Sequence, residues 1–241
     1  MRPLVLVHGF MGGSDQWADQ SVLAEGREVV AVDLPGFGRN AAMDPIDSVA
    51  AFADWVLAEL TRQGIDDFDL LGHSMGGMIV QEMTHRAPAR VARLVLYGTG
   101  AVGVLPGRFE PIETSMQRAR EDGPEATARR ISATWFLDRE ASPAYPACAD
   151  IAARSTLPAI IAGLEAMRGW SGEDRLSTIA CPTLVVWGDG DRTYPWSQTE
   201  RLWQTIPGAG LAVVPSCAHA VHMERSALFN ALVAGFLSGK A

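Results

Sequence analysis

The sequence has little cysteine, and what it has is scattered. Only Cys148, Cys181 and Cys217 occur among 241 residues. Three separated cysteines are too few for a disulfide framework, and they form neither a Cys-x-x-Cys pair nor a Cys/His spacing typical of zinc sites. We therefore expect free thiols, no metal site and a reducing, cytoplasmic location.

Long apolar runs and an excess of positive charge are missing as well. The N-terminal stretch MRPLVLVHGF has an apolar part too short for a signal peptide or a membrane span, and no other uncharged run approaches the length of a span. Lys and Arg total 20 against 28 Asp and Glu, which gives a net charge of −8 at pH 7. This balance argues against nucleic acid or an anionic membrane as the main partner.

Short apolar runs rich in Val and Leu recur along the chain, each bounded by turn residues. Their continuous apolarity is typical of strands buried on both faces of a parallel sheet. Segments with helical spacing separate them, for example the apolar stripes in residues 49–60 and 228–237. The pattern predicts an α/β protein with a doubly wound, mostly parallel sheet. The predicted strands are residues 4–7, 28–34, 67–72, 91–98, 182–188 and 211–216.

One region interrupts this alternation of strands and helices. Between Gly98 and Pro182 the sequence shows no convincing strand, and we interpret the region as a helical insertion over the strand ends. Its large apolar side chains are candidates for lining a pocket, although the same spacing is typical of residues that only pack an insertion onto a core. The helix-like segments are residues 110–122, 124–137, 142–154 and 157–169, and the candidate pocket residues are Trp135, Phe136, Met167 and Trp170.

A serine among glycines follows the third predicted strand. Residues 70–80 read LLGHSMGGMIV, in which Gly72-His73-Ser74-Met75-Gly76 matches the pattern G-x-S-x-G. Between a strand and a helix, this pattern is typical of a nucleophile elbow, whose strained turn exposes the serine side chain. The start of the following helix places an N–H group and a positive dipole end beside a developing oxyanion. Ser74 is therefore the predicted nucleophile.

A serine nucleophile needs a base, and the base needs a carboxylate that orients it. In this architecture both follow the serine, in the order acid and then histidine. His219, on the loop after the last strand, is the predicted base, with His222 as the alternative. The loop GDGD offers two carboxylates, of which we expect Asp191 to orient the histidine and Asp189 to be a turn residue. Asp33, which precedes the serine, is interpreted as a structural carboxylate.

The loop after the first strand reads VHGFMGGS, and its glycines allow the backbone to approach a ligand closely. The backbone N–H groups of Phe10 and Met75 are the predicted oxyanion donors. The same loop lacks the lysine of a phosphate-binding GxxxxGK[ST] loop and does not match GxGxxG, which argues against nucleotide binding.

Five motifs in order resemble those of the α/β-hydrolase superfamily: HGF at 8–10, DLPGFG at 33–38, GHSMGG at 72–77, GDGD at 188–191 and CAHAVH at 217–222. The resemblance covers essentially the whole chain. It implies a serine triad and a core of residues 1–104 and 176–241, with a helical cap of residues 105–175 inserted in it. Because the HG strand starts at residue 3 or 4, we expect about six parallel strands and no counterpart of the first two family strands.

Within the superfamily, the sequence resembles the 3-oxoadipate enol-lactonase-like and carboxylesterase branch. The expected function is hydrolysis of a small carboxylic ester or lactone through an acyl-enzyme, without metal or organic cofactor. The resemblance leaves open a C–C bond hydrolase of aromatic ring-cleavage products and a perhydrolase or haloperoxidase side activity. A non-catalytic ligand-binding protein of the same fold is the alternative outside enzymes, and a damaged triad would favour it.

Overall fold

The computed structural model describes residues 1–108 and 110–239, and six strands in it form one parallel sheet. The strand order is β2-β1-β3-β4-β5-β6, and each neighbouring pair is parallel. This confirms the predicted doubly wound sheet, which begins with the HG strand. The strands are β1 (Leu4–Val7), β2 (Val29–Val32), β3 (Phe68–His73), β4 (Val91–Tyr97), β5 (Thr183–Gly188) and β6 (Gly210–Val214).

Strand β1 is apolar at every position because both faces of the sheet are buried there. In β1, Val5 and Val7 join one hydrophobic cluster, whereas Leu4 and Leu6 join the cluster on the opposite face. Successive side chains of a strand point to opposite faces of the sheet. When both faces are covered, both sets of side chains are buried, so apolar residues do not alternate with polar ones. The continuous apolar runs of the sequence follow from this arrangement.

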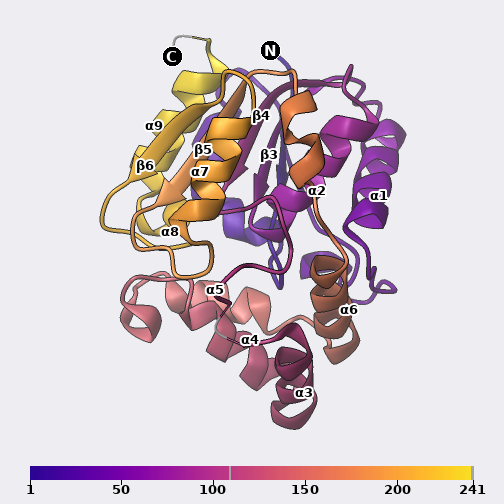
Figure 1. The fold of residues 1–241 in the computed structure, drawn as a ribbon, viewed down its shortest axis with the longest axis vertical. Helices are drawn as coiled ribbons and strands as arrows, with labels where there is room; N and C mark the ends of the chain where they lie inside the picture. Colours follow the sequence, from indigo (N-terminus) through magenta and orange to yellow (C-terminus); the bar gives the residue numbers. More distant parts are fainter. Residues whose placement is uncertain (109, 240–241) are drawn as a thin grey trace.

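Helices cover the two faces of the sheet (Figure 1). On one face lie α1 (Val49–Arg62), α2 (Met75–Arg86) and α7 (Trp196–Thr205), whose buried side chains belong to the first cluster. On the other lie the 3₁₀ segment η1 (Ser14–Ala24), α8 (Val221–Glu224) and α9 (Ser226–Leu237). The side chain of Ser48 caps α1 by accepting a hydrogen bond from the Ala51 amide, which fixes where that helix begins.

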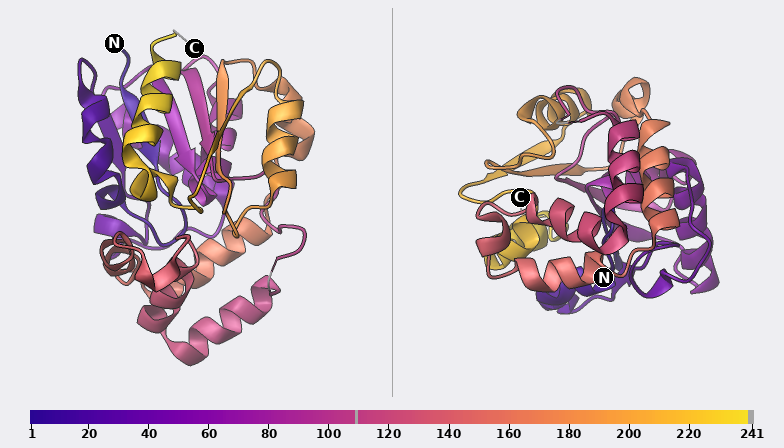
Figure 2. Two further views of the ribbon diagram at one scale, coloured as in Figure 1. Left: turned by 90° about the vertical axis from the view of Figure 1, so that its left-hand side faces the viewer. Right: turned by 90° about the horizontal axis from the view of Figure 1, so that it is seen from below.

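In the described residues between β4 and β5, four α-helices gather beyond the carboxyl ends of the strands (Figure 2). These helices lie close to the four predicted segments; they are α3 (Ile112–Asp122), α4 (Pro124–Ala133), α5 (Tyr145–Ala152) and α6 (Leu157–Arg168). The same stretch contains the short 3₁₀ turns η3 (Arg139–Ala141) and η4 (Glu173–Thr178), and a third such turn, η2 (Gly38–Asn40), follows β2. Among the described residues no single helix is long and apolar enough to cross a membrane. Within the part of the chain that the structure describes, α5 and α6 are the one pair that together would reach that length and apolarity, and they meet at a bend of 97°.

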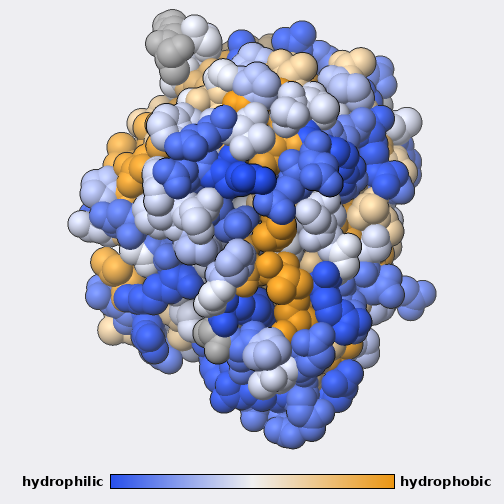
Figure 3. Space-filling view, in the orientation of Figure 1, coloured by the Kyte–Doolittle hydropathy of each residue, from blue (hydrophilic) through white to orange (hydrophobic). Residues whose placement is uncertain are grey.

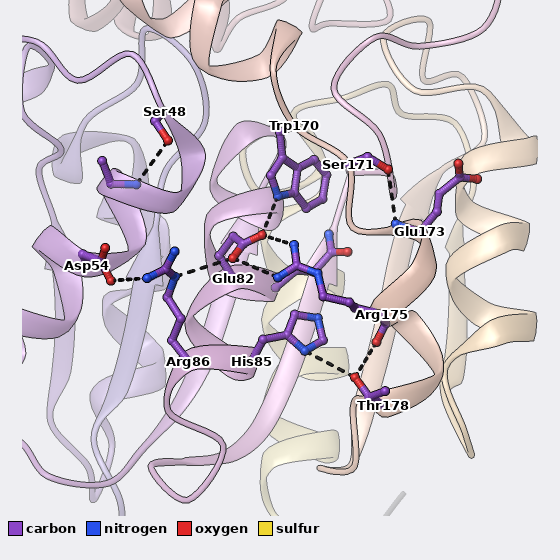
Figure 4. Close-up of polar contacts among 12 residues, drawn as sticks. Ser48, Asp54, Glu82, His85, Arg86, Trp170, Ser171, Glu173, Arg175 and Thr178 are labelled. Atoms are coloured by element: carbon purple, nitrogen blue, oxygen red, sulfur yellow. Dashed lines mark hydrogen bonds and ion pairs between the residues drawn. The ribbon is translucent and has the colours of Figure 1, made fainter.

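A buried carboxylate joins the end of this insertion to the core (Figure 4). Glu82 on α2 accepts a hydrogen bond from the indole of Trp170 at 2.9 Å and pairs with the guanidinium of Arg175. Arg86 lies one turn further along α2, and its Nε forms a second ion pair with Oε2 of Glu82 at 3.6 Å. The Glu82 side chain is only 5% exposed. The contacts therefore fix the chain where it returns from the insertion to β5.

We expect Glu82→Gln to destabilise the fold. Burial opposes ionisation of Glu82, but the hydrogen bonds from Arg175 and Trp170 outweigh burial and lower its pKa. Removing the charge leaves Arg175 without its buried partner, so the free energy of unfolding should fall by about 2 kcal/mol near pH 7. Because the folded-state pKa is depressed, this contribution is complete above the ordinary pKa of 4.5 and disappears as the pH falls through the lower folded value.

Urea unfolding of the variant at pH 7 and at pH 4 measures this contribution. The matched control is Glu59→Gln, which removes the carboxylate of an ion pair with Arg62 on the surface of α1 and should cost less than about 1 kcal/mol. Equal losses in the two variants would contradict a special role of Glu82.

Candidate active site

Ser74 lies in a strained turn between β3 and α2. Its backbone has φ 57° and ψ −122°, a conformation that costs a non-glycine residue about 1–3 kcal/mol. The turn is held by hydrogen bonds from Ser74 N–H to Tyr97 O at 3.0 Å and from the Thr99 hydroxyl to Ser74 O at 2.7 Å. A Cβ atom at Gly72 would come within 2.4 Å of Gly76 O, so the tight turn requires glycine there. The sequence pattern G-x-S-x-G thus has the geometry expected of it.

Asp191 and His219 form a buried pair. Nδ1 of His219 lies 2.9 Å from Oδ2 of Asp191, while the other carboxylate oxygen accepts the backbone N–H groups of Thr193 and Tyr194 at 2.7 and 3.1 Å. Because a carboxylate can only accept, Nδ1 carries the proton and Nε2 is left as an acceptor. Nε2 is buried and has no hydrogen-bond partner among the described residues. The imidazole can therefore accept a proton at Nε2 from a donor that lies next to this atom.

The structure brings Ser74 and His219 to the same end of the sheet. The ring of His73, the residue before the serine, lies 4.5 Å from the ring of His219, centroid to centroid. The ring of Tyr194 also stacks on that of His219, with a centroid distance of 5.6 Å. Ser74, Asp191 and His219 thus come from the carboxyl ends of β3, β5 and β6. This is the arrangement that the sequence predicts for a nucleophile, an orienting acid and a base.

The alternative residues have other partners. Nδ1 of His222 lies 3.0 Å from the Tyr97 hydroxyl, and the ring of His222 lies 4.7 Å from that of Trp17, centroid to centroid. Asp189 accepts the backbone N–H of Ser216 at 2.8 Å and so closes a turn after β6. Asp33 accepts the N–H and hydroxyl of Ser14 at 2.8 and 2.7 Å. These contacts favour His219 over His222 and Asp191 over Asp189.

The loop after β1 is pressed against Ser74. A Cβ atom at Gly9 would lie 2.8 Å from Cβ of Ser74, so glycine is needed for this approach. Nε2 of His8 accepts the Leu34 N–H at 3.0 Å, which leaves Nδ1–H to donate to Gly9 O at 2.8 Å. The loop is thereby anchored with Phe10 next to the elbow, and Met75 is the first residue of α2, whose N–H has no partner within the helix. The prediction that these two N–H groups bind an oxyanion stays a prediction.

The four predicted pocket residues have different surroundings in the structure. The ring of Trp135 lies 6.3 Å from that of His219, and its carbonyl accepts the Ala220 N–H, so it belongs to the surroundings of the base. Phe136 is fully buried against Tyr145, and Trp170 is directed to Glu82. The contacts of these last two are those of packing residues. Met167 packs with its backbone against Gly103 and stays a candidate.

Sequence reasoning did not find the buried polar groups behind His219. The Tyr97 hydroxyl donates to the His219 carbonyl at 2.6 Å, and Nε2 of His73 lies 3.2 Å from the same oxygen. Tyr97 ends an apolar strand and His73 lies inside the elbow motif, so neither stands out in the sequence. The signal is a polar atom at the end of a strand whose other residues, apart from Arg93, are apolar. Together they hold the backbone of the predicted base.

Three buried histidines should make folding stability depend on pH. Burial lowers the pKa of His8 to about 4, that of His222 to about 3, and that of His73 well below 6.5; the nearby His219 adds to the effect on His73 and His222. In the unfolded chain these groups titrate near 6.5, so between pH 6.5 and the folded values only the unfolded state binds the protons. Stability is therefore complete above pH 6.5 and falls as the pH decreases, by about 1.4 kcal/mol per pH unit for each histidine.

Urea unfolding at pH 7.5, 6.5 and 5.5 measures this loss, in a range where carboxylates remain ionised. We expect these three histidines to contribute a slope near three protons, or about 4 kcal/mol per pH unit below pH 6, and His85, whose pKa burial also lowers, to add to it. The variant His222→Gln should reduce the slope by one proton whatever its own stability. A wild-type slope below one proton would refute neutral burial of this cluster.

An open pocket lies beside the insertion. It has a volume of about 370 Å³ and is lined by apolar residues such as Leu105 and Ile112 together with the half-buried Arg108. Figure 3 shows a band of apolar side chains on the same face, where the core meets the insertion.

The sequence model described as the alpha/beta hydrolase family matches residues 4–232. The chain belongs to the alpha/beta hydrolase family. Among the described residues, no group of three or more His, Cys, Asp or Glu side chains is placed to hold a metal ion. The assignment of Ser74, Asp191 and His219 as the catalytic residues of this alpha/beta hydrolase stays a prediction.

Known alpha/beta hydrolases resemble this chain over nearly its whole length. A 2-hydroxy-6-oxononadienedioate/2-hydroxy-6-oxononatrienedioate hydrolase of Klebsiella pneumoniae is 32% identical, and the match covers 98% of this chain and 86% of that protein. A thermophilic esterase from Thermogutta terrifontis has a TM-score of 0.90 at 25% identity, covering 99% and 90% of the two chains. The enol-lactonase from Burkholderia xenovorans has a TM-score of 0.89 at 24% identity, covering 98% and 91%, and shows the same fold.

Proposed function

We propose that the protein is a serine hydrolase that cleaves a small carboxylic ester or lactone through an acyl-enzyme. The observation that carries the proposal is the buried Asp191–His219 pair, whose Nε2 has no partner, beside a serine in a strained elbow. Such a serine is a poor nucleophile unless a base removes its proton, and this imidazole is oriented and in the required tautomer. Similarity to an esterase of known structure supports the same reading.

In the proposed reaction the Ser74 oxygen attacks the substrate carbonyl while Nε2 of His219 accepts the serine proton. The carbonyl electron pair moves onto oxygen, which receives hydrogen bonds from Phe10 and Met75 N–H. The intermediate collapses, the C–O bond to the alcohol breaks, and His219 returns the proton to the leaving oxygen. Water then gives its proton to His219, attacks the acyl-enzyme and releases the acid together with the free serine.

The second candidate function is hydrolysis of a carbon–carbon bond in a vinylogous diketone acid. The specific observation that favours it is the 32% identity with the Klebsiella hydrolase of that substrate type. The same serine, acid and base would serve, so the site itself does not separate the two reactions. A non-catalytic binding role is disfavoured because the acid–base pair is intact.

A substrate panel tests the proposal. Purified protein would be assayed with p-nitrophenyl acetate and butyrate, a five-membered lactone and a dienol ring-cleavage product, with Ser74→Ala as the blank. The proposal expects turnover of an ester or the lactone that the blank lacks. A kcat/KM at least 100-fold higher for the ring-cleavage product would establish the second candidate instead, and turnover by the blank would refute both.

A further inference from the structure

A short segment of the insertion, just after α4, is hydrogen-bonded to both loops that provide the proposed acid and base. We call its residues, Trp135, Phe136 and Leu137, the bridging segment. The carbonyl of Trp135 accepts the N–H of Ala220 at 2.9 Å. The carbonyls of Phe136 and Leu137 accept hydrogen bonds from the guanidinium of Arg192 at 3.2 and 3.1 Å. Ala220 directly follows the base and Arg192 directly follows the acid, so one strip of backbone contacts the neighbours of both.

Glu224, at the end of α8, joins the bridging segment to the loop of the base. Its Oε1 accepts the backbone N–H of Leu137 at 2.8 Å, and its Oε2 accepts the backbone N–H of Ala218 at 2.6 Å. Ala218 is buried and directly precedes His219. Hydrogen bonds to a carboxylate are stronger than those between neutral groups. One side chain thus ties together two backbone segments that lie far apart in the sequence.

The bridging segment also packs between the two loops. A Cβ atom at Gly190 would come within 2.8 Å of Cδ1 of Leu137 and within 3.0 Å of the Cys217 carbonyl, which leaves little room for any other residue there. The N–H of Gly190 donates to that same carbonyl at 2.9 Å, so the loop of the acid and the loop of the base are in direct contact. A displacement of the bridging segment would therefore disturb both loops.

We propose that Glu224 is a positioning residue for the base of this site. It fixes the backbone N–H before His219, while the Trp135 carbonyl fixes the N–H after it, so the loop of the base is bonded to the insertion on both sides of the imidazole. Nε2 must come within hydrogen-bond reach of the serine oxygen, and a displacement of about 1 Å can cost about 100-fold in rate. The inference rests on the proposed function, because it assigns Glu224 a part in bringing His219 to Ser74.

Glu224→Gln tests this role because it keeps the shape of the side chain. The amide has one acceptor oxygen, and its NH₂ group faces the other backbone N–H as a second donor. Only one of the two hydrogen bonds can persist, so the link between Leu137 and Ala218 is broken whichever way the amide turns. We expect kcat on the best ester substrate to fall about tenfold, with KM within twofold of wild type.

Fluorophosphonate labelling separates positioning from a general loss of stability. Labelling of Ser74 is measured under conditions in which circular dichroism shows each variant to be folded. In Glu224→Gln it should reach the final stoichiometry of wild type with a rate constant about tenfold lower. A purely structural role predicts a lower melting temperature and an unchanged rate constant. The matched control is Glu140→Gln, which changes an exposed glutamate three residues after Leu137 and should alter neither kcat nor labelling.

Arg192→Met provides a second test from the side of the acid. It removes the hydrogen bonds to the Phe136 and Leu137 carbonyls and keeps an apolar stem, and kcat should fall about fivefold. Because Arg192 and Glu224 act through the same bridging segment, the double variant should lose less than the product of the two single losses. Losses that multiply would refute a shared action through this segment.

The outcomes distinguish this inference from the proposed function. If Glu224→Gln retains the wild-type kcat and labelling rate while Ser74→Ala is inactive, the role of Glu224 is refuted and the proposed function stands. If wild-type protein is neither labelled nor active on any ester or lactone, both are refuted.

Discussion

Replacing Ser74 by alanine should reduce ester turnover by about 10⁴-fold or more in kcat, down to what the remaining groups provide. Alanine keeps Cβ and therefore the packing against Gly9, but no oxygen is left to attack a carbonyl or to give a proton to His219. The backbone strain at φ 57° also remains, so the fold should be little affected. Initial rates with p-nitrophenyl butyrate and fluorophosphonate labelling measure the loss.

The control is Ser197→Ala, an exposed serine in α7, which should keep wild-type activity and labelling. Circular dichroism and thermal melting of Ser74→Ala establish that the protein is folded when it is assayed. Turnover above one hundredth of wild type in protein free of contaminating esterase would rule out a serine mechanism at this position.

The sheet and the principal residues of the site could be predicted because their signals are local. Each strand contains a run of at least three consecutive apolar residues or is interrupted by few polar ones, and Ser74 is marked by glycines that a tight turn requires at fixed offsets. His219 and Asp191 follow from chain order, since each comes directly after a strand whose carboxyl end must lie at the same edge. In all these cases a few neighbouring residues contain the physical reason for the structure.

Other features depend on contacts between distant segments, and the sequence does not contain them locally. Tyr194 is one aromatic residue in a polar loop, and only the fold shows that its ring lies on His219. Trp170 has the spacing of a pocket residue, yet its indole bonds Glu82, 88 positions earlier in the chain. An apolar or aromatic residue in the insertion can face the substrate or the core, and periodicity alone does not distinguish the two.

The buried polar groups near the base also connect stability with the proposed chemistry. The hydroxyl of Tyr97 and the ring of His73 hold the carbonyl of His219, while His222 fills the space behind it. Neutral imidazoles in such a site can accept as well as donate, but each binds a proton once the chain unfolds below pH 6.5. A site built this way positions its base firmly, and the protein loses stability in mild acid as a consequence.

Asp191→Asn should have the second large effect, with kcat falling by about 10³- to 10⁴-fold. The backbone N–H groups of Thr193 and Tyr194 both bind Oδ1, so the asparagine carbonyl takes that place and the amide nitrogen replaces Oδ2. An NH₂ group facing Nδ1 of His219 can only donate, which forces the ring proton onto Nε2. The imidazole then has no lone pair for the proton of Ser74 and cannot act as its base.

The two aspartates of the GDGD loop provide a matched pair for this experiment. Asp189→Asn retains a carbonyl oxygen for the Ser216 N–H and should change kcat less than twofold. Both variants keep the volume of the side chain, so circular dichroism spectra should superimpose on that of wild type, and kcat/KM between pH 6 and 9 compares their activities. A loss confined to Asp191 follows from its bond to His219. Equal losses in the two variants, or a loss below tenfold in Asp191→Asn, would mean that this carboxylate does not set the tautomer of the base.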